Sequence, residues 1–369
     1  MKKLISLLLA LVLAVSLFAG CTKTPAPVET PEINVENTET PEITTPDVEI
    51  PAAPASFTDS VGRTVEVPAN ITKISPSGAL AQMFLIAIAP DLLCTVASDY
   101  GEYDAQYIPA EVLNLPTVGQ FYGSDNLNYE SIAALGTEIV IDVGEPKNTI
   151  VEDMDSITTN LAIPAVHITA TLNSAPDAFR MLGTLLDREA KGEELALYCE
   201  RILGSVTAMM NDVQMKPSAL YLLGDAGLNV LAATSFHSEV IDYMTNNLAV
   251  VDSPASRGTG NETDLEQISL WNPEFILFAS DVNVAAIEAD PTWQQLDAIK
   301  YGMYYVVPSG PYNWMGTPPA INRYLGMIWM TYVLYTNDDV TFTADVIEYY
   351  KLFYGYELTE AQALAFIGK

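Results

Sequence analysis

Few residues in this sequence are suited to covalent or metal chemistry. The 369-residue chain has two histidines, His167 and His237, and three cysteines, and none of them stands at a spacing typical of metal ligands. It also lacks a Gly-x-Ser-x-Gly nucleophile motif and a Gly-x-x-x-x-Gly-Lys phosphate loop. We therefore expect no enzyme, no cofactor and no bare metal ion. His167 lies in an apolar run and is expected to be a hydrogen-bonded core histidine, whereas His237 could cap a helix or face a cleft.

Aromatic rings are the better candidates for contacts with a ligand. Tyrosines and phenylalanines gather in a loop expected over 99–122, and another group stands in a proline-rich stretch near residue 312. Flat rings with polar edges suit macrocycles and catecholates, and an arginine in a glycine-rich loop suits an anionic chelate. The predicted ligand-binding residues are Tyr100, Tyr122, Arg257, Tyr312 and Trp314. For any single ring, core or surface packing is the alternative, and an ion pair is the alternative for Arg257 and for Arg323.

Two glutamates occupy matching places in an internal repeat. Residues 128–141 align with 264–277 without a gap, at a constant offset of 136, so that Glu130 pairs with Glu266. Each copy reads as a short helix that leads into a strand. An acid in a first turn can simply favour the helix dipole, but its recurrence in both copies suggests a shared role at the surface.

The N-terminal segment reads as a targeting signal followed by a tether. A basic start, the apolar run 4–18 and small residues before Cys21 predict a signal peptide over 1–20 and lipidation of Cys21. Phe18 departs from the small aliphatic residue preferred at its position, so a plain secretory signal is the alternative. Residues 21–56 are rich in Pro, Thr and Glu and are expected to form an unfolded linker. The folded part would then be anchored by lipid to the outer face of the cell membrane.

The remaining residues predict two α/β lobes. Short apolar runs alternate with helical patterns on both sides of a long helical stretch, which favours parallel sheets. The expected boundaries are a first lobe at 57–172, a backbone helix at 173–215 and a second lobe at 216–369. Gly192 and the charges near it suggest two helical pieces in series or one flawed helix that acts as a strut. An ordinary packing helix in one large domain is the alternative.

The order of several motifs resembles one family. The opening hairpin Thr58–Pro68 is followed by Ser98-Asp99-Tyr100, Val118-Gly119-Gln120 and the two Glu-containing repeats, and then by Pro311-Tyr312-Asn313-Trp314 and the stretch 318–326. This series resembles the substrate-binding lipoproteins of ABC importers for iron–siderophore, haem and cobalamin ligands. The resemblance covers about 57–369.

The resemblance implies a fold and a set of partners. It implies two α/β lobes joined by a rigid backbone helix, with the ligand in the cleft between them and little hinge motion. It also implies that Glu130 and Glu266 pair with arginines of a permease dimer that works with an ATPase. The expected function is capture of a ferric siderophore or similar metal chelate by a monomer, with haem or cobalamin as alternative ligands. A surface sensor or adhesin with the same fold is another alternative. The net charge of −31 argues against nucleic acid as a partner.

Overall fold

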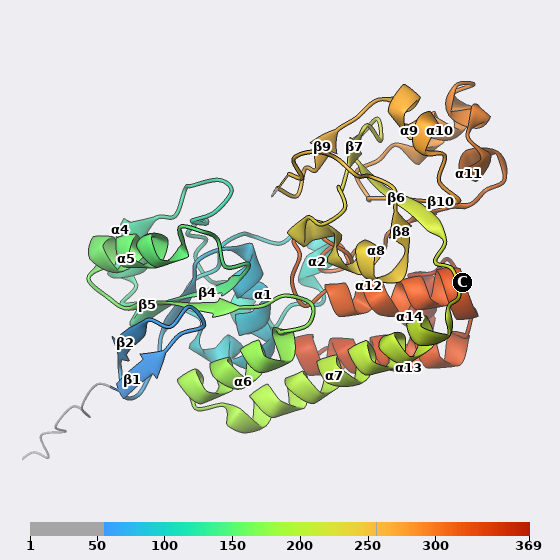
Figure 1. Ribbon diagram of the computed structural model, residues 1–369. Helices are drawn as coiled ribbons and strands as arrows, with labels where there is room; N and C mark the ends of the chain where they lie inside the picture. Colours follow the sequence, from blue (N-terminus) through green and yellow to red (C-terminus); the bar gives the residue numbers. More distant parts are fainter. Residues whose placement is uncertain (1–54, 256) are drawn as a thin grey trace, which may run out of the picture. The chain divides into compact units, whose positions relative to one another are not determined.

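The computed structural model describes residues 55–255 and 257–369 (Figure 1). The predicted signal peptide, the lipidated Cys21 and nearly all of the linker lie outside these residues. Within the two ranges, no helix combines the length and the apolar character that crossing a membrane requires.

The first lobe is a three-stranded parallel sheet with helices on both faces. The order β3-β4-β5 places the fully buried β4 in the centre. Alternate residues of β4 face opposite cores: Ile139, Ile141 and Val143 pack with α1, and Val140 packs with α4 and α5. The predicted hairpin is present, and Arg63 donates from it to Ala165 O at 3.1 Å. The elements of this lobe are β1 (Ala55–Thr58), β2 (Thr64–Val67), β3 (Ile74–Pro76), α1 (Ala79–Ile88), α2 (Glu102–Ala105), α3 (Ala110–Leu113), α4 (Tyr129–Ala134), β4 (Ile139–Gly144), α5 (Ile150–Leu161) and β5 (Ala165–Thr169).

The stretch predicted as two helical pieces in series or one flawed helix does form two helices, but they do not run in series, because the chain folds back on itself between them. Helix α6 (Ala175–Leu186) ends at Asp187, which has a left-handed φ of 56°, and α7 (Glu189–Asp212) then runs antiparallel beside it. Gly192 does not interrupt α7 but allows α7 to approach α6 closely, since a Cβ at this position would lie 2.6 Å from Phe179 O. Helix α7 alone is the backbone helix, about 36 Å long at 1.5 Å per residue.

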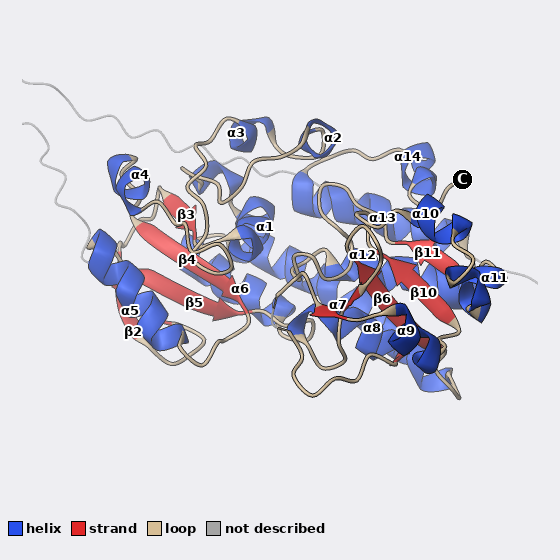
Figure 2. Ribbon diagram, turned by 90° about the horizontal axis from the view of Figure 1, so that it is seen from above, coloured by secondary structure: helices blue, strands red, loops and turns tan. Residues whose placement is uncertain are grey.

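The second lobe is built on a parallel core of three strands in the order β11-β10-β6, extended by short antiparallel strands. One face packs with α9, α10 and α11 through Leu220, Leu222 and Ile276, and the other faces the main core. Figure 2 shows the two sheets at opposite ends of the folded part. The elements are β6 (Ser218–Leu223), β7 (Asn229–Val230), α8 (Glu239–Met244), β8 (Asn246–Asn247), β9 (Asn261–Glu262), α9 (Leu265–Trp271), β10 (Phe275–Phe278), α10 (Val284–Ala289), α11 (Asp297–Lys300) and β11 (Tyr304–Val306).

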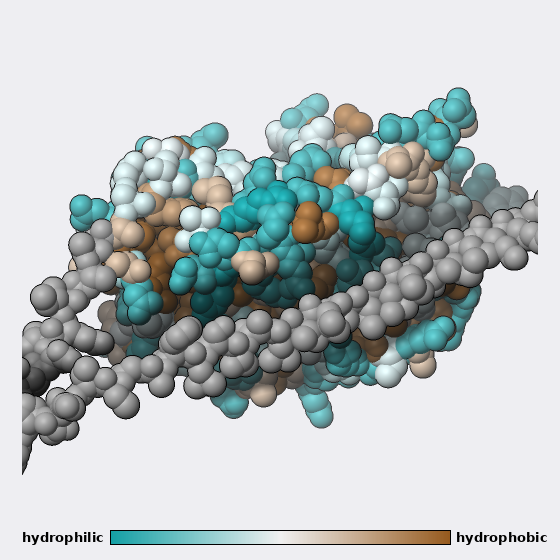
Figure 3. Space-filling model, turned by 90° about the horizontal axis from the view of Figure 1, so that it is seen from below, coloured by the Kyte–Doolittle hydropathy of each residue, from teal (hydrophilic) through white to brown (hydrophobic). Residues whose placement is uncertain are grey.

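The C-terminal helices join the two lobes. Helix α12 (Arg323–Met330) continues as a π-helix at Thr331–Thr336 and is followed by α13 (Asp339–Tyr354) and α14 (Glu360–Ala365). Helix α13 packs on both α1 and α7, and the rings of Phe353 and Phe179 lie 5.8 Å apart. The largest hydrophobic core therefore runs from one lobe into the other. Figure 3 shows the molecule from below, where hydrophilic residues cover much of the visible surface of the described residues.

An ion pair between α12 and α8 fixes the segment 170–172, which follows β5. Arg323, 1% exposed, pairs with Glu239 of α8 and donates to Ala170 O at 3.1 Å. Glu239 accepts from Leu172 N at 3.1 Å, and Tyr324 Oη donates to Leu172 O at 2.8 Å. The segment 170–172 is thus attached to two helices of the second half of the chain.

The internal repeat is confirmed as a structural repeat. Asn128 and Asp264 cap α4 and α9, accepting from the backbone N–H three residues on at 2.9 and 2.8 Å. At the other end, Glu138 accepts from Thr72 N and Glu274 from Ser218 N, both at 2.6 Å. The same cap and the same carboxylate therefore join helix to strand in both lobes.

Some expected elements differ from those observed. The apolar run 92–97 has the pattern of a strand but forms only isolated bridges at Leu93 and Val96. The loop expected over 99–122 contains α2 and α3, because short runs without glycine or proline close single helical turns. The apolar stretch 320–335 has the pattern of a helix, but α12 begins three residues into it and widens into the π-helix.

Candidate ligand site

The principal cavity lies at the carboxyl ends of the parallel strands of the second lobe. It has a volume of about 440 Å³ and is formed by the loops that follow β6, β10 and β11. Ligands of open α/β sheets bind at this edge because the loops there converge. The lining residues are Leu223, Gly224, Asn229, Gly258, Thr259, Ala279, Ser280, Asp281, Ser309, Pro311, Tyr312, Asn313 and Thr317.

Trp314 does not contact this cavity, and its prediction as a ligand-stacking ring is wrong for this conformation. Its side chain is fully buried, and its ring centroid lies 4.7 Å from that of Phe366 in the segment after α14. Gly310 packs against Tyr107 and Phe366, and its carbonyl accepts from Tyr350 Oη. Trp314 and its neighbours therefore support the loop that carries the cavity wall.

Tyr100 and Tyr312 meet at a contact between the lobes. Their hydroxyl oxygens are 2.6 Å apart, and the amide of Gln82 in α1 contacts both, with Nε2 at 2.6 Å from Tyr100 Oη and 3.3 Å from Tyr312 Oη. Burial raises the pKa of Tyr100 to about 12 and raises that of Tyr312 well above its usual value. Both phenols therefore keep their protons at neutral pH. Of the two, only Tyr312 lines the cavity.

Asn313 contributes a second polar group to the cavity wall. Its Oδ1 accepts from Tyr221 Oη at 3.1 Å and from Met315 N at 2.9 Å, which fixes the orientation of the amide. Asn313 is 7% exposed, and its Nδ2 has no acceptor among the described residues. Asn313 belongs to the motif Pro311-Tyr312-Asn313-Trp314 but is not among the predicted ligand-binding residues. Gln82 was missed altogether, although it is the one polar residue within α1.

Tyr122 lies in the first lobe, away from the cavity lining. Its hydroxyl donates to Asp153 at 2.7 Å, its ring packs on Phe121, and Lys147 Nζ lies 5.3 Å from the ring centroid. Burial and Asp153 raise the pKa of Tyr122 well above the usual range. Its side chain is part of a packed cluster with α5, so the structure does not bring it together with Tyr312.

The basic residues around the cavity are differently placed. Arg257 is exposed and directly precedes Gly258 and Thr259 of the lining. The Nδ1 of His237 lies 2.6 Å from Gly316 O, and its ring is close to Gly258. Arg323 is held by Glu239, as described above, so it cannot meet a ligand in this conformation.

The corresponding edge of the first lobe carries a closed polar network. Ser77 Oγ donates to one oxygen of Asp142, and His167 Nδ1 lies 2.6 Å from the other. His167 Nε2 lies 3.2 Å from Thr169 Oγ1. His167 is fully buried, which confirms the expected core histidine.

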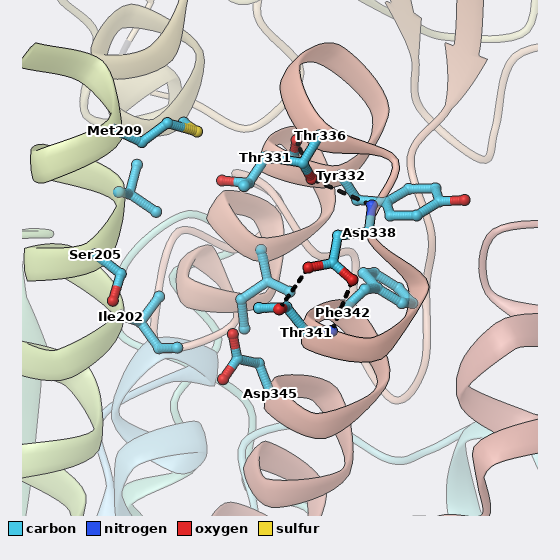
Figure 4. Close-up of a pocket in the computed structure, with 12 residues that line it drawn as sticks. Ile202, Ser205, Met209, Thr331, Tyr332, Thr336, Asp338, Thr341, Phe342 and Asp345 are labelled. Atoms are coloured by element: carbon cyan, nitrogen blue, oxygen red, sulfur yellow. Dashed lines mark hydrogen bonds between the residues drawn. The ribbon is translucent and has the colours of Figure 1, made fainter. Parts of the chain in front are cut away.

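A second cavity is too small for a chelate. Figure 4 shows it between α7, the π-helix and α13, with Asp338, Thr341 and Thr336 joined by hydrogen bonds on one side. Its volume of about 90 Å³ suits a few waters and falls below the 300–1,000 Å³ typical of small-molecule sites. In the ranges that the structure describes, no group of three or more His, Cys, Asp or Glu residues could hold a metal ion.

Glu130 and Glu266 are both exposed, each at the second residue of its short helix. Figure 1 shows α4 and α9 on the upper side of the view, one on each lobe and opposite the α6–α7 pair. Neither carboxylate belongs to an ion pair within residues 55–255 and 257–369. The two predicted docking residues thus present their charges on one side of the folded part.

Comparison with known proteins gives the same fold. An ABC transporter solute-binding protein from Sulfurospirillum deleyianum is 24% identical with a TM-score of 0.77, over 85% of this chain and 99% of its own. Helicobacter pylori CeuE, solved as a Ni–His complex, is 15% identical with a TM-score of 0.65, over 86% and 100%. S. aureus IsdE, complexed with heme, is 18% identical with a TM-score of 0.54, over 72% and 99%.

These likenesses to solved structures confirm the predicted architecture of two α/β lobes. No curated protein matches the chain significantly. The family model described as "Periplasmic binding protein" matches residues 87–311, which is more than half of the chain and includes β4, the α6–α7 pair and most of the cavity. The chain belongs to the periplasmic binding protein family.

Proposed function

We propose that this protein is the lipid-anchored substrate-binding component of an ABC importer, and that it captures a ferric siderophore or similar metal chelate in the cavity of the second lobe. The observation that carries the proposal is the 440 Å³ cavity at the carboxyl strand ends, beside the Tyr100–Tyr312 contact between the lobes. The similar structures support it, since they include an ABC transporter solute-binding protein, a Ni–His complex and a heme complex. Haem and cobalamin are the alternative ligands.

The lining favours recognition of the organic part of a chelate. It consists of backbone, hydroxyl and amide groups with one carboxylate, Asp281, and the described lining residues include no His, Cys, Lys or Arg. Thiolate and imidazole are the protein ligands that soft and borderline metals prefer, so the metal would arrive already coordinated. Without a cation in the wall, a neutral ferric trihydroxamate is favoured over a trianionic ferric catecholate.

Binding of a defined panel tests the proposed ligand class. The purified protein would be titrated with ferric trihydroxamate, ferric catecholate, haem and cobalamin, with tryptophan fluorescence and the thermal midpoint as readouts. A ligand at 100 times its Kd should add about 2.7 kcal/mol to the free energy of unfolding. We expect ferric trihydroxamate to bind and to emerge chemically unchanged. The proposal is overturned if no member of the panel binds.

The exposed glutamates are proposed to dock the protein onto its permease. One carboxylate on each lobe suits two permease subunits that each present arginine, and such pairs set orientation and association rate. The Glu130→Lys/Glu266→Lys double variant should keep its chelate affinity and lose most transport in cells. Normal transport would contradict the docking role and favour a sensor or adhesin that works without a permease.

Cys21 is proposed as the site of the lipid anchor. Its position after small residues and before the Pro-rich linker supports this assignment. Cys21→Ser should move the protein from the membrane fraction to the medium, as measured by immunoblot. Retention of the variant by lipid would place the anchor elsewhere.

A further inference from the structure

The cavity wall contains hydrogen-bond donors that have no acceptor, and this surplus defines the face of the ligand that it meets. This inference rests on the proposed binding function and adds to it the chemistry of recognition. Gln82, a buried residue of α1, has an amide whose orientation is fixed. Its Oε1 accepts from the backbone N–H groups of Ala97 and Ser98, so Nε2 must face the two tyrosines.

Counting protons around Gln82 leaves one donor over. The Nε2 group supplies two protons and each tyrosine hydroxyl supplies one, which makes four donors. The acceptors in contact are Tyr100 Oη, Tyr312 Oη and, at 3.4 Å from Nε2, Ser98 O. One tyrosine hydroxyl donates to the other across 2.6 Å. The two Nε2 protons are donated to the acceptors named above, so neither leaves an acceptor for the second hydroxyl. The second hydroxyl proton then has no acceptor among the described residues.

Asn313 adds an independent surplus donor next to the first. Its Oδ1 is occupied by Tyr221 and Met315, and its nine-tenths buried Nδ2 has no acceptor in the described part of the chain. A buried donor without an acceptor costs about 1–3 kcal/mol. Tyr312 and Asn313 are consecutive residues and both line the cavity. Both surplus donors therefore belong to residues of the wall that a ligand acceptor would meet.

We propose that Tyr312 Oη and Asn313 Nδ2 form a paired donor site for acceptor oxygens of the chelate, and that Gln82 is the positioning residue that directs the Tyr312 proton to the ligand. Hydroxamate, carboxylate and catecholate oxygens all have this acceptor character. The site selects chelates whose outer surface presents such oxygens over chelates that present N–H groups or carbon alone.

Two tyrosine variants separate this role from general packing. Tyr312→Phe and Tyr100→Phe each remove one hydroxyl, and both break the Tyr100–Tyr312 hydrogen bond. Only Tyr312→Phe removes the donor that lines the cavity. With ferric trihydroxamate as the probe, Tyr312→Phe should weaken binding about tenfold. Tyr100→Phe should stay within about twofold of the parent, since Tyr312 keeps its own proton.

Two amide variants test the direction of the hydrogen bonds. Asn313→Asp keeps the oxygen that Tyr221 and Met315 need but replaces the Nδ2 donor by an acceptor, so affinity should fall at neutral pH. In Gln82→Glu, an ionised carboxylate accepts from the hydroxyls and takes the surplus proton. Burial raises the pKa of such a carboxyl, so affinity should be low above that pKa and recover as the pH falls through it.

The outcomes distinguish this inference from the proposed function. If the parent binds ferric trihydroxamate and the Tyr312 and Tyr100 variants behave alike, or Gln82→Glu shows the pH profile of the parent, the donor site is wrong and the binding function stands. If the parent binds no panel member, the function itself has failed, and this inference fails with it. Circular dichroism and thermal unfolding of each variant would establish that it is folded.

Discussion

The carboxyl edges of the two sheets are built from similar elements but treat their polar groups in opposite ways. In the first lobe, Ser77, Asp142 and His167 satisfy one another. In the second lobe, Asn313 Nδ2 has no acceptor among the described residues, and Asn313 and Tyr312 both line a cavity of about 440 Å³. Buried polar groups are normally paired, and Asn313 is the cavity-lining residue whose buried side-chain amide lacks an acceptor among the described residues, so a ligand acceptor is expected beside it. Two sheet edges of similar topology therefore differ in whether their buried polar groups are paired within the protein.

The largest effect is expected where the two lobes are joined. Arg323→Met would leave the partly buried Glu239 carboxylate without its partner and should lower the free energy of unfolding by about 3 kcal/mol, the lower end for a buried pair, measured by urea denaturation. The double variant Arg323→Met/Glu239→Gln should lose less than the single variant, because no charge remains unpaired. A loss under about 1 kcal/mol in the single variant would contradict this.

The closed network should matter for stability and the open one for binding. Asp142→Ala leaves Ser77 Oγ and His167 Nδ1 buried without an acceptor and should cost about 3 kcal/mol of unfolding free energy. Tyr312→Phe should cost less than about 1 kcal/mol while weakening ferric trihydroxamate binding. If the two variants lose equal stability, the two edges do not differ as described.

Helix α7 contains two glycines, Gly192 and Gly204, that provide a matched pair of variants. Gly192→Ala places a Cβ 2.6 Å from Phe179 O and should destabilise the protein by about 2 kcal/mol. Gly204→Ala meets no atom within 4 Å and should stabilise it by about 0.5–1 kcal/mol. Guanidinium unfolding of both variants would check the sign of each change. Similar effects at both sites would mean that α6 and α7 do not approach closely at Gly192.

The smallest effects concern the features that the lobes share. Asn128→Ala and Asp264→Ala each remove one helix cap and should each cost about 1 kcal/mol, as measured by thermal unfolding. Equal costs would support the structural repeat. A cost confined to one lobe would show that the two caps are not equivalent.

Sequence patterns predicted the elements better than the way they pack. The hairpin, β4, β5, β6 and the repeat follow from alternation, turn residues and spacing, which act over a few residues. The reversal of the chain between α6 and α7 was missed because a glycine within a helical pattern suggests a break in the helix. Gly192 instead allows a close contact between α7 and Phe179 of α6, which local sequence patterns do not reveal.

The candidate site was predicted only in part. Tyr312 lines the cavity and Arg257 lies beside it, as expected from their loops, but no observation yet tests their contact with a ligand. Trp314 was misplaced because its burial depends on Phe366, more than fifty residues away. Gln82 left one signal, a single amide in an otherwise apolar helix. Its importance follows from contacts with Ala97 and Tyr312 that no local pattern contains.

The most direct test of the account is the position of iron in a crystal of the protein grown with ferric trihydroxamate. Anomalous scattering at the iron edge locates the metal without assumptions about the chelate. The account predicts a peak in the cavity of the second lobe, with chelate oxygens within hydrogen-bond distance of Tyr312 Oη and Asn313 Nδ2. A peak against Tyr122 and the edge of the first lobe, or in the groove between α7 and α13, would contradict it.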